Sequence, residues 1–284
     1  PPSATSIPAP TPVPTPTPVP APTPTPTPAP LSAAKVFALM SPSVAFIQTP
    51  VGSGSGVLIP GGYVVTNAHV VWPFNEVRVV FPDGSEYLEA PVMNPDQMAD
   101  LAVIGPLKTS GDPLPLADGE DLLIGSELFL IGYPAEQAQF PQLAITRGIL
   151  SRLREWEPIE MTYLQTDATI AGGQSGGILV SEDGDVVGIS GLSFGEAAFG
   201  LVASAADVKP RVEGLILGQD VAGLGDRRVP VGGGQTEHDF YLLSAWDVST
   251  YVIHEPAGTA VDIELESDAD AVFTLVDMTG NVLA

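Results

Sequence analysis

The chain has 284 residues, and its 34 acidic and 10 basic residues give a formal net charge of −24 at pH 7. This surplus of negative charge argues against nucleic acid or an anionic membrane surface as a partner. There is no cysteine, which excludes disulfides and thiol chemistry. There is also no apolar run of about 18 residues, the length that a membrane-spanning helix needs.

The first element is a spacer of residues 1–30, in which every second residue from Pro8 to Pro30 is proline. Proline has no amide donor and a fixed φ, so we expect a disordered, extended polyproline II segment. A tail without any role is the alternative. The chain begins with Pro1 rather than methionine, so we expect a trimmed product from which a signal peptide or lipid anchor was removed. A cysteine-free Pro/Thr spacer favours a bacterial protein that is secreted or held at the outer cell surface or envelope.

Residues 31–218 are predicted to form the main folded domain. A short helix is expected from a cap at Ser32 to Met40, where Pro42 ends it. Short apolar runs broken by Gly, Pro and Asp then follow, and Asp83-Gly84 and Asp183-Gly184 are hairpin-turn signals. Because no helical pattern separates these runs, they favour an all-β barrel or sandwich over a parallel sheet. The expected strands are Val44–Gln48, Gly56–Ile59, Tyr63–Thr66, Val77–Phe81, Leu101–Ile104, Leu128–Ile131, Ile178–Val180 and Val186–Ser190.

A second helix is expected to end near Leu217, with Gly218 as its stop signal. Ser204 and Asp207 are both candidate caps, and Asp207 is favoured because Pro210 is tolerated in the first turn of a helix. Residues 219–236 are predicted to be a glycine-rich linker. Residues 237–284 alternate again and predict a second, smaller β-region with strands at Tyr251–Ile253, Val261–Leu265 and Ala271–Val276.

Three residues spread along the main domain predict nucleophilic catalysis. Ser175 lies inside a glycine run, His69 ends an apolar strand, and Asp100 opens another. A serine hydroxyl needs an adjacent base, and the base needs a carboxylate that fixes its tautomer. His69 is the only histidine of this region, and Asp100 is favoured over Asp96 because it precedes a buried strand. The order histidine, aspartate, serine is that of the two-barrel serine proteases.

The backbone amides of Gly173 and Ser175 are the predicted oxyanion hole, since glycine lets the peptide turn its N–H inward. The same Gly-x-Ser-x-Gly pattern also fits the nucleophile elbow of α/β-hydrolases. That alternative requires a strand–serine–helix unit and a histidine downstream, namely His238 or His254. A hairpin follows Ser175 instead, so we set this alternative aside.

From about Leu31 to Leu217, the chain resembles the HtrA-like (Deg-type) branch of the trypsin-fold serine proteases. The resemblance implies two six-stranded β-barrels, with His69, Asp100 and Ser175 as base, orienting acid and nucleophile in the cleft between them. The motifs that carry it are Ser41-Pro-Ser-Val-Ala45, Gly52-Ser-Gly-Ser-Gly-Val57, Tyr63-Val-Val-Thr-Asn-Ala-His-Val-Val71, Asp100-Leu-Ala-Val103, Ile131-Gly-Tyr-Pro134, Leu164-Gln-Thr-Asp-Ala168 and Gly173-Gln-Ser-Gly-Gly177.

The sequence departs from this family in two places. The family usually has asparagine at the position of Gln174 and an asparagine-proline pair at the position of Ala171-Gly172. This difference affects the loop that forms the oxyanion hole, and a flipped 172–173 peptide would leave the hole unformed at rest. Gln174 also cannot form the ion pair that activates digestive-type zymogens, so no activation by N-terminal cleavage is expected. The PDZ domain common in the family is not recognisable. Instead, residues 239–284 resemble the start of a bacterial pre-peptidase C-terminal β-sandwich, for which a generic β-hairpin extension is the alternative.

In the trypsin fold, the floor of the specificity pocket comes from the residue six before the serine and from the strand after the hairpin. These are the predicted substrate-binding residues Thr169, Ser190, Gly191 and Leu192. None carries a carboxylate, so we expect a small or medium aliphatic side chain before the scissile bond. The substrate backbone is expected to add as an extended strand along Ser190–Leu192, and Asp167 is expected to be a structural hydrogen-bonding group.

The sequence therefore predicts a serine endopeptidase that cleaves extended or unfolded polypeptides through an acyl-enzyme. No cofactor is predicted, and no His/Asp/Glu cluster has metal-ligand spacing. Two alternatives remain open. One is a catalytically silent binding or chaperone-like module on the same fold, and the other is an esterase.

Overall fold

The computed structural model describes residues 30–218, except 51, 73, 94, 98, 119–121, 136–140 and 195–198, and the short stretches 229–231 and 251–253. The predicted Pro/Thr spacer, except Pro30, lies outside the described residues. So does most of the predicted C-terminal β-region.

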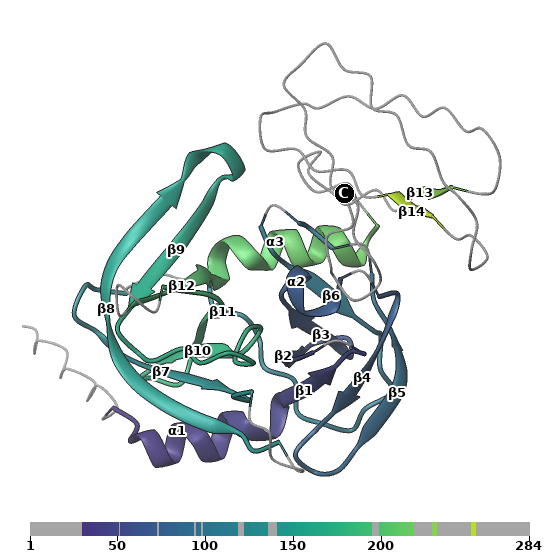
Figure 1. Ribbon diagram of the computed structural model, residues 1–284. Helices are drawn as coiled ribbons and strands as arrows, with labels where there is room; N and C mark the ends of the chain where they lie inside the picture. Colours follow the sequence, from purple (N-terminus) through teal and green to yellow (C-terminus); the bar gives the residue numbers. More distant parts are fainter. Residues whose placement is uncertain are drawn as a thin grey trace, which may run out of the picture.

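The first half of the described domain is a six-stranded antiparallel sheet (Figure 1). Its order is β5-β4-β1-β2-β3-β6. The two edge strands approach each other just beyond β5, where Val92 forms an isolated bridge with Ile104 and the Met93 N–H donates to the Val103 carbonyl at 2.8 Å. This contact curls the sheet into a near-barrel. The strands are β1 Val44–Gln48, β2 Ser53–Ile59, β3 Tyr63–Thr66, β4 Glu76–Val80, β5 Glu86–Pro91 and β6 Ala102–Ile104.

The second half is a closed barrel with the order β10-β11-β12-β9-β8-β7. Its strands β8 and β9 extend beyond the barrel as a protruding hairpin (Figure 1). The strands are β7 Glu127–Gly132, β8 Ala144–Trp156, β9 Met161–Thr166, β10 Ile178–Ser181, β11 Val186–Phe194 and β12 Phe199–Ser204. The predicted all-β fold with two six-stranded barrels is confirmed.

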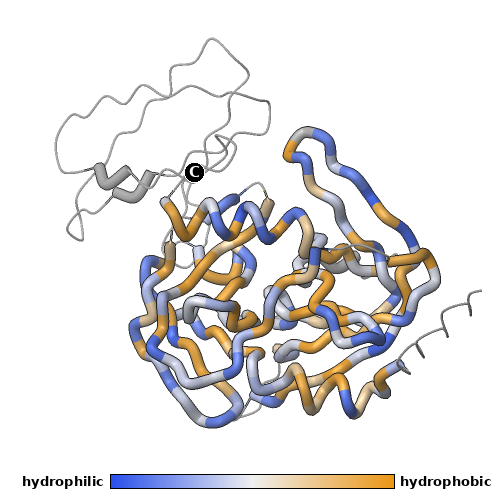
Figure 2. The backbone as a smooth tube through the Cα atoms, turned by 180° about the vertical axis from the view of Figure 1, so that it is seen from behind, coloured by the Kyte–Doolittle hydropathy of each residue, from blue (hydrophilic) through white to orange (hydrophobic). Residues whose placement is uncertain are grey.

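The two β-units share the largest of the three buried hydrophobic clusters of the described domain. The largest buried cluster includes Val65 and Val103 from the first unit and Ile131 and Ile178 from the second. Hydrophilic and hydrophobic residues alternate along many of the strands (Figure 2). The strand β4 buries one face and leaves the other partly open to solvent, whereas β6 and β10 are buried along their whole length. Because this cluster contains residues of both units, it holds the two units together at their junction.

Two helices pack on the outside of this core. The helix α1, Ala33–Met40, begins after Ser32, whose Oγ accepts from the Lys35 N–H at 3.4 Å, as predicted. A single 3₁₀ turn, η1 (Ser41–Ser43), follows it. The helix α3, Ala205–Ile216, lies across the top of the domain (Figure 1).

The predicted start of α3 at Asp207 is wrong. Ser204 is the residue before the helix, and Pro210 lies inside it. Proline removes one backbone hydrogen bond there, but Val208 and Val212 on either side are fully buried in the core. Their burial outweighs the proline's cost, so packing sets the helix boundary. Asp207 instead accepts a hydrogen bond from the Thr162 N–H at 2.6 Å.

All eight strands expected in the main domain exist; β1 and β3 have the expected bounds, and the other six differ by one to four residues. The strands β5, β8, β9 and β12 were not predicted. The 13-residue strand β8 is solvent-exposed along much of its length, so the apolar alternation that marks a half-buried strand is weak there. Between β8 and β9, residues Glu157–Ile159 form a 3₁₀ turn, η2.

Two short strands are described beyond residue 218. Val229–Val231 (β13) falls within the predicted linker and pairs in parallel with Tyr251–Ile253 (β14), a predicted strand. The predicted strands at Val261–Leu265 and Ala271–Val276, and His238 and His254, lie outside the described residues. Among the helices that are described, none has the length and apolar character that crossing a bilayer would require.

Candidate active site

His69 is presented by one short helical turn that follows a buried strand. This turn, α2 (Ala68–Val71), begins directly after β3, with Asn67 as its first flanking residue. Ala68, Val70 and Val71 are buried and anchor the turn. The side chain of His69 is the exception, with 49% of its surface exposed. The apolar neighbours therefore hold the imidazole at the surface of the junction between the two β-units.

Asp100 meets His69 with both carboxylate oxygens. Its Oδ2 lies 2.7 Å from Nδ1 of His69, and its Oδ1 accepts from the His69 backbone N–H at 2.9 Å. Asp100 has a φ of +53°, which is uncommon for a residue other than glycine. Its carbonyl accepts from Nδ2 of Asn67 at 2.9 Å. Residues of the His69 segment thus hold Asp100 at both its backbone and its carboxylate.

This pair fixes the chemistry of the imidazole. A nitrogen facing a carboxylate at hydrogen-bond distance carries the proton, so Nδ1 is the donor and Nε2 is left as the basic nitrogen. The hydrogen bond to Asp100, opposed by partial desolvation, raises the pKa of His69 above its ordinary 6.5. The arrangement suits a base that is oriented by an acid.

Asp96, the competing acid, is engaged elsewhere. It is fully buried, and its Oδ2 lies 2.6 Å from Nη1 of Arg211. Its Oδ1 accepts from the Ala99 N–H at 2.9 Å. Of the two candidate acids, the structure therefore places Asp100 and not Asp96 beside His69.

The loop of Ser175 and the segment of His69 meet at the same residue of β2, Ser55. The backbone N–H of Ser55 in β2 donates to the Ser175 carbonyl at 2.8 Å, and the Ser55 carbonyl accepts from Oγ1 of Thr66 at 2.7 Å. Thr66 is the last residue of β3, three positions before His69. The structure therefore brings the serine loop and the histidine turn to the same junction.

The hydroxyl of Ser175 donates to the Gly191 carbonyl at 3.4 Å, a long contact. Within the described structure it makes no hydrogen bond to His69. Gly191 itself lies beside Asn67, since a Cβ built on it would be 3.2 Å from the Asn67 Nδ2. A rotation of the Ser175 side chain is therefore needed before the hydroxyl donates to an imidazole on this side of the junction.

The loop before Ser175 is a tight turn with its peptides fixed. The Gln174 N–H donates to the Ala171 carbonyl at 3.1 Å, and Gly173 sits in the turn with φ +85°. The Gly172 carbonyl accepts from the Ala135 N–H at 2.6 Å. Because the N–H and C=O of a trans peptide point in opposite directions, this contact directs the Gly173 N–H away from Ala135.

Gln174 closes this turn with its side chain. It is 1% exposed, and its Oε1 accepts from the Ala171 N–H at 2.8 Å. The Gln174 carbonyl in turn accepts from the hydroxyl of Ser190 at 2.9 Å. The Gln174 side chain thus makes its hydrogen bond within its own loop.

Among the described residues, neither the Gly173 N–H nor the Ser175 N–H has a hydrogen-bond acceptor. The neighbouring carbonyl of Gly173 is held by Oγ of Ser55 at 2.9 Å. The amides of Gly173 and Ser175 are therefore free to donate hydrogen bonds. An oxyanion that forms during hydrolysis requires two such donors.

The predicted substrate-binding residues lie around this loop but differ in their exposure and in their hydrogen bonds. Thr169 is exposed, and its carbonyl accepts from Oγ1 of Thr146 at 2.9 Å. Ser190 is fully buried and its backbone N–H and C=O are paired with Gly177 and Gly176 at 2.8 Å each. The part of β11 open to another strand therefore begins after Ser190, at Gly191. The side chain of Leu192 lies outside the described residues.

Asp167 accepts from the Ile149 N–H at 2.7 Å, the structural hydrogen bond that was predicted for it. Among the residues that the structure describes, no group of three or more His, Cys, Asp or Glu side chains is placed to hold a metal ion.

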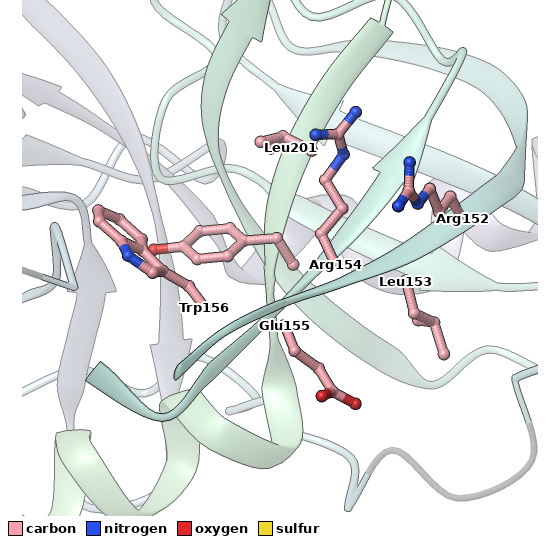
Figure 3. A pocket seen from close by; sticks show the side chains of 7 residues that line it. Arg152, Leu153, Arg154, Glu155, Trp156 and Leu201 are labelled. Atoms are coloured by element: carbon pink, nitrogen blue, oxygen red, sulfur yellow. The ribbon is translucent and has the colours of Figure 1, made fainter. Parts of the chain in front are cut away.

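A separate open pocket of about 640 Å³ lies on the protruding hairpin (Figure 3). Arg152 and Arg154 point to one side of β8 and Glu155 to the other, as strand alternation requires. The guanidinium of Arg154 lies 5.3 Å from the centre of the Phe199 ring. This pocket contains none of the residues predicted to bind substrate. Its remaining lining residues are Leu153, Trp156, Tyr163 and Leu201.

Sequence reasoning missed the residues that support the site. Ser55 holds the Gly173 carbonyl with its hydroxyl, and Asn67 holds the Asp100 carbonyl with its amide. Both lie within motifs that were singled out, Gly52–Val57 and Tyr63–Val71. The polar side chains of those motifs were the available signal, but their partners are distant in sequence and become visible only in the fold.

The fold and the geometry of the site define a trypsin-like serine peptidase domain. The family model described as "Trypsin-like peptidase domain" matches residues 54–189. The serine endoprotease from Yersinia pestis superposes with a TM-score of 0.57 at 30% identity, over 66% of this chain and 68% of that one. The HtrA-type protease AlgW, solved with a tripeptide, superposes with a TM-score of 0.60 at 26% identity, over 66% of this chain and 65% of that one.

The chain contains a trypsin-like serine protease domain that is similar to the HtrA/DegP-like serine endoproteases. The "Probable periplasmic serine endoprotease DegP-like" of Halomonas elongata is 39% identical over 147 residues, which are 50% of this chain and 29% of that protein. Serine endoprotease DegS of Salmonella typhimurium is 37% identical over 146 residues, 50% of this chain and 40% of that protein. The chain thus spans less than half the length of these relatives.

Proposed function

We propose that this chain is an active serine endopeptidase that hydrolyses extended or unfolded polypeptides. The observation that carries the proposal is the hydrogen-bonded pair of His69 and Asp100, joined through β2 to the loop of Ser175. His69 is the base, Asp100 the orienting acid and Ser175 the nucleophile. The amides of Gly173 and Ser175 are the oxyanion donors.

The geometry supports the following steps. Ser175 Oγ turns from the Gly191 carbonyl to Nε2 of His69, gives up its proton and attacks the peptide carbonyl carbon. The carbonyl oxygen becomes an oxyanion at the two amides, the C–N bond breaks, and His69 returns the proton to the leaving amine. Water, deprotonated by His69, then cleaves the acyl-enzyme ester and regenerates the hydroxyl. No metal or cofactor takes part in these steps.

The substrate is proposed to add as a strand along the free edge of β11 that begins at Gly191. An incoming backbone N–H would replace Ser175 Oγ at the Gly191 carbonyl, which releases the hydroxyl toward His69. Binding and activation of the nucleophile are therefore coupled. We further propose a bacterial protein that is secreted or held in the envelope. The H. elongata relative is described as periplasmic, and this description supports the location together with the Pro/Thr-rich segment at the start of the chain.

One observation favours a second candidate function. Ser175 contacts Gly191 rather than His69 at rest, as expected for a catalytically silent binding or chaperone-like module. Labelling with a fluorophosphonate probe separates the two. We expect covalent labelling of the wild-type chain and none of Ser175→Ala, with hydrolysis of casein exceeding that of a p-nitrophenyl ester. A wild-type chain that stays unlabelled, even with an unfolded polypeptide present, would show the silent module, and ester hydrolysis alone would show an esterase.

The specificity pocket is proposed to accept small or medium aliphatic side chains, with Thr169 at its floor. Replacing Thr169 by aspartate places a carboxylate there, which we expect to raise kcat/KM for substrates with arginine before the scissile bond by about tenfold or more and to lower it for valine substrates. Peptide substrates that differ only at that residue provide the measurement, with Thr169→Ser as the matched control. An unchanged ratio of the two kcat/KM values would place Thr169 outside the pocket.

A further inference from the structure

A buried ion pair lies next to the proposed active site but touches none of its reacting groups. Nη1 of Arg211, on α3, lies 2.6 Å from Oδ2 of Asp96. The Asp96 side chain is fully buried and that of Arg211 is 9% exposed. Replacing both members of such a pair by well-packed hydrophobic residues of similar volume is often harmless to stability, because the cost of desolvating two charges offsets their attraction. A contribution to fold stability therefore does not explain the presence of this ion pair.

Asp96 forms the base of the loop that ends in Asp100. Its backbone N–H donates to the Leu101 carbonyl at 2.8 Å, and the Leu101 N–H donates back to the Asp96 carbonyl at 2.9 Å. The Asp96 carboxylate also accepts from the Ala99 N–H. Leu101 is the residue after Asp100, so these bonds bracket the residue whose φ is +53°. The position of Asp96 therefore decides where the Asp100 carboxylate points.

Arg211 fixes Asp96 relative to the second barrel. Its Nη2 donates to the Ile159 carbonyl in the turn between β8 and β9. The side chain therefore connects α3, the β8–β9 turn and the Asp100 loop of the first unit. The pKa of Tyr163 reflects how close Asp96, Asp100 and Arg211 lie to one another. Burial of Tyr163 is the main cause that raises this pKa to about 12, and the charge of Asp100 is the next. The charges of Asp96 and Arg211 act on it as well.

We propose that Asp96 and Arg211 are positioning residues, whose buried ion pair holds the loop that presents Asp100 to His69 across the junction of the two β-units. The expected effect of this ion pair on kcat rests on the proposed peptidase function. Its expected effect on the contact between Asp100 and His69 does not. The guanidinium is the suitable group, because its planar fork donates in two directions at once, to the Asp96 carboxylate and to the Ile159 carbonyl.

The test uses the double variant Asp96→Asn/Arg211→Met, which removes both charges and leaves neither one unpaired. The measurements are the pKa of His69 by NMR titration, assigned with His69→Gln, and kcat and KM on a peptide substrate. We expect the pKa of His69 to fall toward 6.5, because its bond to Asp100 loosens. We expect kcat to fall between about tenfold and a hundredfold with KM within about twofold. The matched control is Asp118→Asn/Lys209→Met, which removes an exposed ion pair of 2.7 Å whose lysine lies on the same helix. It is expected to change none of the three quantities.

A further comparison separates positioning from general loosening of the fold. In an Asp100→Asn background the double variant is expected to lower kcat by less than about twofold, because the group it positions is already lost. An equal loss in both backgrounds, or an unchanged pKa of His69, would overturn the proposal. The NMR result stands even if the wild-type chain proves inactive, so failure of the proposed function is distinguishable from failure of this inference. If the double variant does not fold, Arg211→Lys is the alternative, because it keeps the positive charge but not the planar fork of the guanidinium. A wild-type pKa of His69 together with a wild-type kcat in Arg211→Lys would overturn the proposal.

Discussion

Replacing Asp100 by asparagine is expected to lower kcat by about 10⁴-fold while leaving the fold intact. The two Asp100 oxygens accept from Nδ1–H and from the backbone N–H of His69, at 2.7 and 2.9 Å. An asparagine has one oxygen, so either the backbone bond is lost or the amide NH₂ faces Nδ1. In the second case Nδ1 becomes an acceptor and the proton moves to Nε2, the nitrogen that must take the proton of Ser175. In that orientation the variant carries a base in the wrong tautomer, and in the other orientation it loses the bond that fixes the His69 backbone.

The same variant is expected to show a changed pH dependence. His69 acts as a base only when neutral, so kcat/KM falls as the pH drops through its pKa. Asp100 raises that pKa by its hydrogen bond and its charge. Asparagine removes the charge, so the acidic limb of the residual kcat/KM profile should move to lower pH.

Steady-state kinetics of both chains from pH 5 to 9 provide the measurement. Asp83→Asn is the matched control, because Asp83 also accepts from a backbone N–H, that of Ser85 at 2.8 Å, in an exposed turn. It is expected to keep the wild-type kcat and profile. An Asp100→Asn chain with more than about a tenth of the wild-type kcat would contradict the role of Asp100.

The fold and the candidate residues were predictable from the sequence to different degrees. The buried strands β1 and β3 were predicted to the residue, because each is a compact apolar run bounded by polar or turn residues. The exposed strand β8 was missed, since pairing with β7 and β9 rather than its own apolar pattern makes it a strand. Local sequence patterns therefore predicted the buried strands. The exposed strand β8 depends on pairing with other strands, which local patterns do not show.

The choice between Asp96 and Asp100 shows a similar limit. Both precede the same buried strand, and the sequence favoured Asp100 only by its closeness to that strand. In the structure Asp100 faces His69, whereas Asp96 is committed to Arg211, 115 residues further along the chain. A partner at that separation leaves no local signal, so neither the buried pair nor its effect on the loop was predictable. The start of α3 was misjudged for a related reason, since the burial of Val208 and Val212 overrides the local preference of Pro210.

Gly176→Ala is expected to have the second large effect, this time on stability and activity together. A Cβ at this position would lie 2.0 Å from the Ser55 carbonyl oxygen and 2.4 Å from Oγ1 of Thr66, and the residue has φ +80°. Positive φ alone costs alanine about 1–2 kcal/mol, and the overlap with backbone forces the loop away from β2. We expect the free energy of unfolding to fall by about 3 kcal/mol or more, with kcat/KM reduced by about a hundredfold or more in the chain that remains folded.

Both effects follow from one contact, because Ser55 is where the serine loop and the His69 segment meet. Moving the loop off Ser55 breaks the Ser55 N–H bond to the Ser175 carbonyl and separates the nucleophile from its base. Denaturant unfolding and fluorophosphonate labelling kinetics measure the two consequences. Gly52→Ala is the matched control, because a Cβ there meets nothing within 4 Å and its φ is not positive. A Gly176→Ala chain that labels at the wild-type rate would mean that close packing of this loop against β2 is not what brings Ser175 to His69.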